Sequence, residues 1–390
     1  MTFFLLFVIY YIMPKAYKYR IYPNNSQKTA LAQGFGNCRF VYNNALAFKK
    51  SQYDQNKKSI SCFDLINRLT TLKSEFDFLK ISPSQTLQQS LRNLDSSYKN
   101  FFKKTGSFPN FKSKFAKQTL NFPQGVKIDF KNSRVYIPKI GKTLGVLHRK
   151  FPTDSKIKTC TVSKTTSNKY FISILVETEQ VLTKPKIKQT IGIDLGIKDF
   201  LTMSNGKKIA NPKHYKKSLM LLKDLQRSLN RKIKSSNNYY RMKLRIAKLH
   251  EYISNCRKDF LHKESLRLID ENQAIFLEDL DVKGLQEKSN KIMNRNISDV
   301  SWGEFVRILE YKANWYGRDI VKIDPRNTSK MCSVCKKINA ELALSDREWQ
   351  CKHCHSKHDR DINAAKNIYR SGTDLWMDNQ RLSRKEAPTF

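Results

Sequence analysis

The sequence predicts a multidomain α+β protein, in which a β-barrel interrupted by a helical block precedes an α/β domain that carries a small cysteine module. Three observations support this fold class. The 390 residues are enough for two or three domains. Helical and strand-like periodicities occur in separate blocks of the chain. Two CxxC pairs near the C-terminus have the spacing of a zinc ribbon.

The first block combines one strand, a helical stretch and several further strands. Residues 15–25 alternate in hydrophobicity and end in a turn, which indicates a strand. From Ser26 to about Phe115, apolar residues recur every three or four positions, as is typical of amphipathic helices. Residues 118–180 contain short runs rich in β-branched and aromatic residues. We therefore expect a small β-barrel or sandwich that includes the N-terminal strand, with the helices inserted between strands.

The second block begins after a linker at Lys184-Pro185-Lys186. Residues 189–210 are typical of consecutive strands, with a hairpin turn at Ser204-Asn205-Gly206. A long basic helical stretch follows over residues 213–270, and then come a strand, a helix, a strand, the cysteine module and a last helix. This order predicts a mixed α/β sheet rather than a doubly wound one.

The charge of the chain indicates a polyanionic partner. There are 73 Lys and Arg against 34 Asp and Glu, which gives a net charge of +39. A compact body with this charge repels itself unless a polyanion is bound, and nucleic acid is the first candidate. A membrane surface is less favoured because the charge is spread along the whole chain. The apolar run Thr2–Ile12 is too short for a spanning helix, which needs about 20 residues. We interpret Met13 as the start and residues 1–12 as an upstream extension.

Three acidic residues lie in settings that suit a metal or phosphate site. Asp194 shares one strand face with Gly192 and Gly196, so a ligand can approach it closely. Glu278, followed by Asp279, ends an apolar run that reads as a buried strand, where an unpaired carboxylate is costly. Taken alone, Asp194 is equally typical of an exposed turn, and Glu278 of a strand that emerges into solvent.

The third acid, Asp361, lies in the first turn of the last helix. It shares a helix face with Ala364 and Ala365, which let that face pack tightly against a sheet, and Asp359 is the expected N-cap. Helix capping alone would also explain these acids. If Asp194, Glu278 and Asp361 converge, their mutual repulsion favours divalent cations, and two Mg²⁺ ions about 4 Å apart hydrolyse phosphodiesters.

The cysteine module is the most specific single motif. Cys332, Cys335, Cys351 and Cys354 have the spacing of a structural four-cysteine zinc site, and redox pairs are the weaker alternative. Because four thiolates are available, the neighbouring histidines are treated as non-ligands: His353, His355 and His358. The remaining cysteines are isolated and are interpreted as reduced thiols: Cys38, Cys62, Cys160 and Cys256.

The order of these motifs resembles the TnpB (OrfB) family of insertion-sequence proteins, which is related to the type V CRISPR effectors. GIDLG, a basic helical stretch, LEDL, Asp324-Pro325 leading to Thr328-Ser329-x2-Cys332, the ribbon and DRDINAA follow one another. The opening KAYKYRIYPN, followed by RFVYNNAL, also resembles that family. The resemblance extends from Met13 to about Gly372.

The resemblance implies an RNA-guided DNA endonuclease with a RuvC-like, RNase H-type core. Asp194, Glu278 and Asp361 match the family's triad for two catalytic Mg²⁺ ions, and the four cysteines match its ligands for one structural Zn²⁺. The expected partners are a guide RNA from the transposon end and double-stranded DNA cut beside a short adjacent motif. A monomeric ribonucleoprotein in a prokaryotic cytoplasm, at the nucleoid and without a membrane, is expected.

The resemblance also implies a division into domains, with the following boundaries: an upstream extension at 1–12, a β-barrel wedge domain at 13–27 and 118–183, a helical recognition lobe at 28–117, a RuvC-like nuclease domain at 187–325 and 359–390, and a zinc ribbon at 326–358. Three other functions remain open at this point. They are a guide-RNA-dependent DNA-binding regulator without cleavage, a cut-and-paste transposase, and a structural RNA-binding protein.

Overall fold

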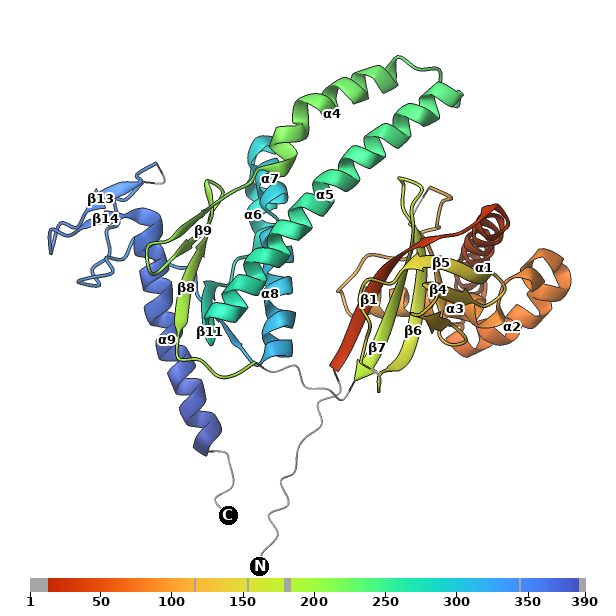
Figure 1. Ribbon diagram of the computed structural model, residues 1–390, viewed down its shortest axis with the longest axis horizontal. Coiled ribbons are helices and arrows are strands. Elements are labelled where there is room, and N and C mark those ends of the chain that lie inside the picture. Colours follow the sequence, from red (N-terminus) through yellow and green to blue (C-terminus); the bar gives the residue numbers. More distant parts are fainter. Residues whose placement is uncertain (1–12, 116, 153, 179–183, 344, 386–390) are drawn as a thin grey trace, which may run out of the picture. The chain divides into compact units, whose positions relative to one another are not determined.

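The computed structural model describes residues 13–115, 117–152, 154–178, 184–343 and 345–385 (Figure 1). The chain divides into two compact units, Met1–Gln180 and Val181–Phe390, each with its own hydrophobic core. Within the described ranges, no helix has the length and apolarity needed to cross a bilayer. The interpretation of residues 1–12 as an extension lies outside the described residues.

The first unit contains a seven-stranded antiparallel sheet in the order β2-β6-β7-β1-β5-β4-β3. The strands are β1 (Met13–Tyr22), β2 (Gln118–Phe122), β3 (Lys127–Asp129), β4 (Arg134–Ile137), β5 (Gly141–Val146), β6 (Lys156–Lys164) and β7 (Tyr170–Thr178). Strand β1 lies between β7 and β5, which confirms that the N-terminal strand joins strands that follow the helical block. The described residues of β2 and β3 are not hydrogen-bonded to each other, so the sheet is open rather than a closed barrel.

The helical block packs against this sheet and covers the edge strand β2. It consists of α1 (Asn25–Asn56), α2 (Cys62–Glu75), the short 3₁₀ helix η1 (Asp77–Ile81) and α3 (Ser84–Phe102). The sequence indicated that the helical stretch begins at Ser26, but the N-cap of α1 is Asn24, which forms a capping box with Gln27. A Cβ at Gly34 would lie 2.9 Å from Leu120 Cδ1 in β2, so glycine permits the close approach of α1. Because α1 and α3 contact β2, its outer edge is covered and has no need to pair with β3.

The second unit contains a five-stranded mixed sheet in the order β10-β9-β8-β11-β12. The strands are β8 (Thr190–Leu195), β9 (Asp199–Met203), β10 (Lys208–Ala210), β11 (Ala274–Glu278) and β12 (Asp319–Ile323). Strands β8, β9 and β10 pair antiparallel, whereas β8, β11 and β12 run parallel. The prediction of a mixed sheet is therefore confirmed. Gly206 in the β9–β10 turn has φ +88°, a conformation that favours glycine.

The second unit also contains helices, some of which cover the two faces of the mixed sheet. They are α4 (His214–Asn230), α5 (Asn237–Glu271), α6 (Val282–Lys288), α7 (Lys291–Val300), α8 (Trp302–Tyr316) and α9 (Arg360–Lys385). Ile275 and Leu277 of β11 belong to a core shared with α5 and α8, whereas Ala274 and Phe276 belong to a separate core with α9. This alternation assigns α5 and α8 to one face and α9 to the other. The cysteine module lies between β12 and α9, and its second pair, Cys351 and Cys354, lies in the turn of the hairpin of β13 (Glu348–Gln350) and β14 (Lys357–Asp359).

Helix α9 lies unusually close to the sheet at two glycines. A Cβ at Gly192 in β8 would come within 2.5 Å of the Ala365 carbonyl oxygen, and one at Gly372 in α9 would come within 2.4 Å of Phe276 Cγ. No side chain fits at either place, so these glycines set the distance between α9 and the strands β8 and β11. The C-terminal ends of these two strands are thereby held beside the first turn of α9.

Candidate active site

Asp194 and Glu278 end two neighbouring parallel strands. Leu277 of β11 pairs with Ile193 of β8, so the next residue on each strand is an acid. Ile193 and Leu277 face the α5–α8 core, and the alternation of a strand therefore turns both acids to the opposite face, toward α9. Helix α9 presents Asp361 in its first turn on that face. Three elements distant in sequence thus each bring one carboxylate to the same end of the sheet.

The pKa of Asp194 is affected by burial and by the other two acids. Burial raises the pKa of Asp194 to about 7, and the carboxylates of Glu278 and Asp361 add to the rise. Burial also raises the pKa of Glu278. Acids that disfavour one another's charge in a desolvated site are the donor set that divalent cations occupy. The residues present therefore fit bound Mg²⁺ chemically.

The three acids are more widely spaced than ligands of a single small ion. In the described part of the chain, the four cysteines form the only group of three or more metal-ligating side chains whose donor atoms all lie within 4.8 Å of one another. The oxygens of Asp194, Glu278 and Asp361 do not meet that limit together. Carboxylates that hold two cations about 4 Å apart need not all touch one ion. The spacing is therefore compatible with a pair of ions.

The position of Asp361 is fixed by the hydrogen bonds that cap the N-terminus of α9. Asp359 Oδ1 accepts hydrogen bonds from the backbone N–H groups of Asp361 at 3.1 Å and Ile362 at 3.0 Å, which confirms Asp359 as the N-cap. Lys208 Nζ lies 2.7 Å from Asp359 Oδ2 and anchors the cap to β10. Arg347 Nη1 of the cysteine module lies 3.7 Å from Asp361 Oδ1. A cation from the module thus contacts one acid of the site.

Glu278 is positioned by a residue that the sequence analysis did not assign. Thr328 Oγ1 donates a hydrogen bond of 2.5 Å to Glu278 Oε1, which orients the carboxylate and leaves its other oxygen for a ligand. The Thr328 carbonyl oxygen in turn accepts from Asn367 Nδ2 at 2.8 Å. Asn363 Nδ2 donates to the Met331 carbonyl oxygen at 2.7 Å. Two asparagines of α9 thus fasten the segment before the first cysteine to the helix that carries Asp361.

One signal in the sequence could have revealed this link. Asn363 and Asn367 are spaced by four residues, so they share one face of α9, and both are almost fully buried where the segment from Thr328 to Met331 lies. A buried amide needs hydrogen-bond partners, so two asparagines on one packed helix face indicate a backbone segment lying against it.

The four cysteine sulfurs form a compact cluster. Cys332 Sγ lies 3.6 Å from Cys354 Sγ, and Cys335 Sγ lies 3.5 Å from Cys351 Sγ. Four sulfurs at 2.3 Å from a tetrahedral zinc ion would be about 3.8 Å apart, so the cluster fits one Zn²⁺. A hydrogen bond from the Ser356 side chain lowers the pKa of Cys354 to about 6, which favours the thiolate that zinc binds.

The three histidines near the cluster differ in their positions. His353 and His355 are exposed, whereas His358 Nε2 lies 3.1 Å from Cys332 Sγ and 2.9 Å from Ser356 Oγ. The group whose donor atoms lie within 4.8 Å of one another contains the four cysteines and no histidine. His358 is therefore placed to hydrogen-bond a sulfur ligand rather than to replace it.

A cationic cavity adjoins Asp361. The cavity has a volume of about 480 Å³ and reaches from Leu195 to Trp302. Its wall includes four basic side chains, Lys198, Lys213, Lys216 and Arg347, against three acidic ones, Asp199, Asp299 and Asp361, so basic groups are in slight excess. Basic side chains in this number neutralise phosphates, so the cavity suits the backbone of a nucleic acid beside the acids.

Family models match three parts of the chain. A family described as a probable transposase (OrfB of IS605 type) matches residues 173–289, and a Cas12f1-like TNB domain matches residues 302–368. A domain described as helix-turn-helix matches residues 13–58. In the structure, that last stretch forms strand β1 and the single long helix α1 rather than two helices joined by a turn.

Two relatives match over most of their length. A Streptomyces pristinaespiralis protein, named as a candidate RNA-guided DNA endonuclease, is 37% identical over 363 residues, covering 92% of this chain and 89% of that protein. InsQ of Escherichia coli K12, named in the same way, is 34% identical, with 92% of each chain covered. A cryo-EM structure of a Cas12f1–sgRNA–target DNA complex matches with a TM-score of 0.54 and 15% identity, covering 92% of this chain and 99% of that chain. At this identity, the likeness to the solved structure concerns the fold alone.

Proposed function

The chain belongs to the TnpB (OrfB) family, and we propose that it is an RNA-guided endonuclease that cuts double-stranded DNA beside a short adjacent motif. The convergence of Asp194, Glu278 and Asp361 beside a basic cavity carries the proposal. The relatives named as RNA-guided DNA endonucleases support it.

The topology of the second unit supports a RuvC-like, RNase H-type nuclease core. Its first three strands form an antiparallel meander and its last two run parallel to the first, in the order β10-β9-β8-β11-β12. In this proposal, the cysteine module is a zinc ribbon inserted before α9. The open sheet of the first unit is the wedge domain, and its helical block is the recognition lobe.

The acids have separate roles in the proposed chemistry. Asp194, Glu278 and Asp361 would hold two Mg²⁺ ions, which supply an activated water and stabilise the leaving oxygen of a phosphodiester. Thr328 holds Glu278 in one orientation through its hydroxyl. The Asp359 cap fixes the first turn of α9 and with it the backbone of Asp361. The basic cavity would orient the DNA backbone. Water would add to the phosphorus and the bond to the 3′ oxygen would break, which leaves a 5′-phosphate and a 3′-hydroxyl.

The ribbon zinc has a structural role in this proposal. Four cysteine ligands leave no open position on a tetrahedral ion, so the ion itself activates no water. Its effect reaches the acids through the chain: the segment that begins the ribbon also carries Thr328, which contacts Glu278.

The proposed partners follow from the charge and the family. A net charge of +39 suits a complex in which RNA and DNA backbones are both neutralised. The partners would be a guide RNA from the transposon end, which reads the target by base pairing, and double-stranded DNA. We propose that one protein chain forms the ribonucleoprotein and acts at the prokaryotic nucleoid.

The decisive experiment is cleavage of a guide-matched plasmid in Mg²⁺. Asp361→Asn should abolish cleavage while the protein still binds guide and target. Asp374→Asn, an exposed acid farther along the same helix, is the matched control and should cleave normally. Guide-dependent binding without cleavage by the unmodified protein would instead favour a DNA-binding regulator. Products that end in 3′-phosphates would contradict the proposed hydrolysis.

A further inference from the structure

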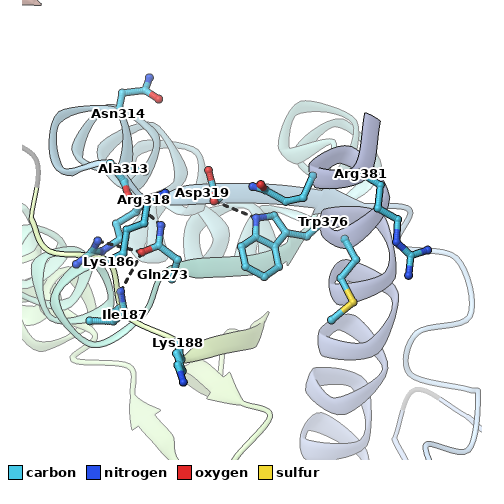
Figure 2. A pocket seen from close by; sticks show the side chains of 13 residues that line it. Lys186, Ile187, Lys188, Gln273, Ala313, Asn314, Arg318, Asp319, Trp376 and Arg381 are labelled. Atoms are coloured by element: carbon cyan, nitrogen blue, oxygen red, sulfur yellow. Dashed lines mark hydrogen bonds between the residues drawn. The ribbon is translucent and has the colours of Figure 1, made fainter. Parts of the chain in front are cut away.

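A second cavity lies at the opposite end of the strands from the acids (Figure 2). It has a volume of about 810 Å³, and its wall includes Gln273 and Asp319. Gln273 immediately precedes β11 and Asp319 begins β12, whereas Glu278 ends β11. Five residues of extended chain span about 16 Å, so this cavity is separate from the candidate active site.

The cavity is strongly cationic. Four basic side chains line it against one carboxylate: Lys186, Lys188, Arg318 and Arg381 against Asp319. The carboxylate of Asp319 is already engaged, because its Oδ2 accepts a hydrogen bond of 2.9 Å from Trp376 Nε1. Arg381 Nη1 lies 3.7 Å from Asp378 Oδ1 on its own helix, whereas Lys186 and Lys188 are exposed and have no ion-pair partner within the described ranges. The cavity therefore presents an excess of positive charge.

Arg318 is a buried charge without a counter-ion. It is 5% exposed, and its Nε donates to the Ile269 carbonyl oxygen at 3.0 Å while Nη1 donates to Gln273 Oε1 at 3.2 Å. Both acceptors are neutral. No carboxylate of the described residues lies within ion-pair distance of the guanidinium. Burying a charge without its counter-charge is costly. An anionic ligand in the cavity would supply that counter-charge.

Trp376 provides a flat apolar surface in the same cavity. Its hydrogen bond to Asp319 and its contact with Phe276, with ring centroids 6.4 Å apart, hold the indole in place. Figure 2 shows the ring lying between Asp319 and the helix α9. An aromatic ring beside basic side chains is the arrangement on which proteins stack unpaired bases.

We propose that this cavity binds one unstacked nucleotide of a single-stranded RNA segment. The base lies on Trp376. One flanking phosphate supplies the counter-charge of Arg318, and the other lies on Lys186 and Lys188. This inference rests on the proposed function: DNA is cut at the other end of the strands, so the nucleic acid held here is the guide RNA, which stays bound. Single-stranded RNA is commonly recognised through bases stacked on aromatic side chains.

The first test is ultraviolet crosslinking of the full chain with the RNA that copurifies with it, followed by mass spectrometry of the peptides. A ribonucleotide attached to the α9 peptide that contains Trp376 is the expected result. Adducts elsewhere in the chain, with none on residues of this cavity, would overturn the proposal. A deoxyribonucleotide on Trp376 would overturn the assignment to RNA.

The second test measures the affinity of the full chain for the guide RNA. Trp376→Leu should weaken binding about 5- to 150-fold, the range for loss of one stacked base. Lys188→Glu changes an exposed residue that does not support the fold, and it should weaken binding and lower the dependence of affinity on salt. Lys337→Glu, an exposed lysine of the cysteine module, is the control with the same charge change.

The outcomes separate this site from the proposed function. Unchanged guide affinity in both variants, together with guided cleavage of DNA, would overturn the RNA site and leave the endonuclease proposal intact. If the unmodified chain binds no RNA at all, both proposals fall. A loss of affinity equal to that of Lys337→Glu would also overturn the site, because the effect would then be one of net charge.

Discussion

Replacing Asp194 by asparagine should stabilise the protein in Mg²⁺-free buffer while it destroys the candidate active site. The folded structure raises the pKa of this carboxyl from its usual 3.8 to about 7. One pKa unit corresponds to 1.36 kcal/mol, so keeping Asp194 ionised above pH 7 costs at most about 4 kcal/mol of folding free energy. Asparagine has nearly the same shape and no charge, and it removes this cost.

The sign of the pH dependence follows from the same shift. Because the folded-state pKa lies above the unfolded one, the folded protein binds the proton more tightly between pH 4 and pH 7. The contribution of Asp194 to stability is fully present below about pH 4 and is lost as the pH rises through 7. The stability difference between Asp194→Asn and the unmodified protein should therefore be about 1.5 kcal/mol at pH 5 and about 4 kcal/mol at pH 8.

Urea unfolding followed by tryptophan fluorescence measures this stability difference for the second compact unit of the chain. All four tryptophans lie in Val181–Phe390: Trp302, Trp315, Trp349 and Trp376. The unfolding signal therefore reports the unit that contains Asp194. Mg²⁺ should stabilise the unmodified protein at pH 8 and have much less effect on the variant.

Asp374→Asn is the matched control because it removes one exposed carboxylate from the same unit. It should show no gain in stability that depends on pH. The reasoning would be refuted if Asp194→Asn were no more stable at pH 8 than this control, or if its gain did not grow between pH 5 and pH 8. Either result would mean that the three acids do not repel one another in the folded protein.

Four further outcomes are expected. Thr328→Val should slow single-turnover cleavage on the order of 10-fold, because it removes the hydrogen bond that orients Glu278, and Thr328→Ser should restore the rate. Gly192→Ala should lower the free energy of unfolding by about 1–3 kcal/mol in urea, since its Cβ would meet the backbone of α9. Cys351→Ser should lower the zinc content measured by mass spectrometry of metals from one ion per chain to well below one, with loss of the Trp349 environment in fluorescence. Lys312→Met should raise stability below pH 8, because burial lowers the pKa of Lys312 to about 8 and the unfolded chain binds the extra proton; urea titrations should show this gain shrinking between pH 8 and 10.5.

Local pattern alone predicted much of the candidate active site. Strand alternation placed Asp194 on the same face as Gly192, and the structure shows that face packed against α9. The Asp359 cap and the cysteine cluster also follow from spacing over a few residues. Each of these features depends on the geometry of one strand, one helix turn or one CxxC pair, and residues close in sequence determine that geometry.

Other features could not be read from the chain. The hydrogen bond from Thr328 to Glu278 joins residues 50 positions apart, and the seven-stranded sheet is open where the pattern predicted a barrel. The second cavity, which contains Trp376, is formed by the linker at Lys186, the starts of β11 and β12, and the end of α9. None of these partners is near the others in sequence, so periodicity carries no information about them.

The sequence by itself determined which side chains share a face, because helices and strands repeat at fixed periods. It also determined the order of the motifs along the chain. The tertiary structure decided which faces meet: the pairing of β8 with β11 and the packing of α9 on both bring three acids from distant positions to one end of a sheet. That choice depends on burying apolar area over the whole unit, a global property that no short segment contains.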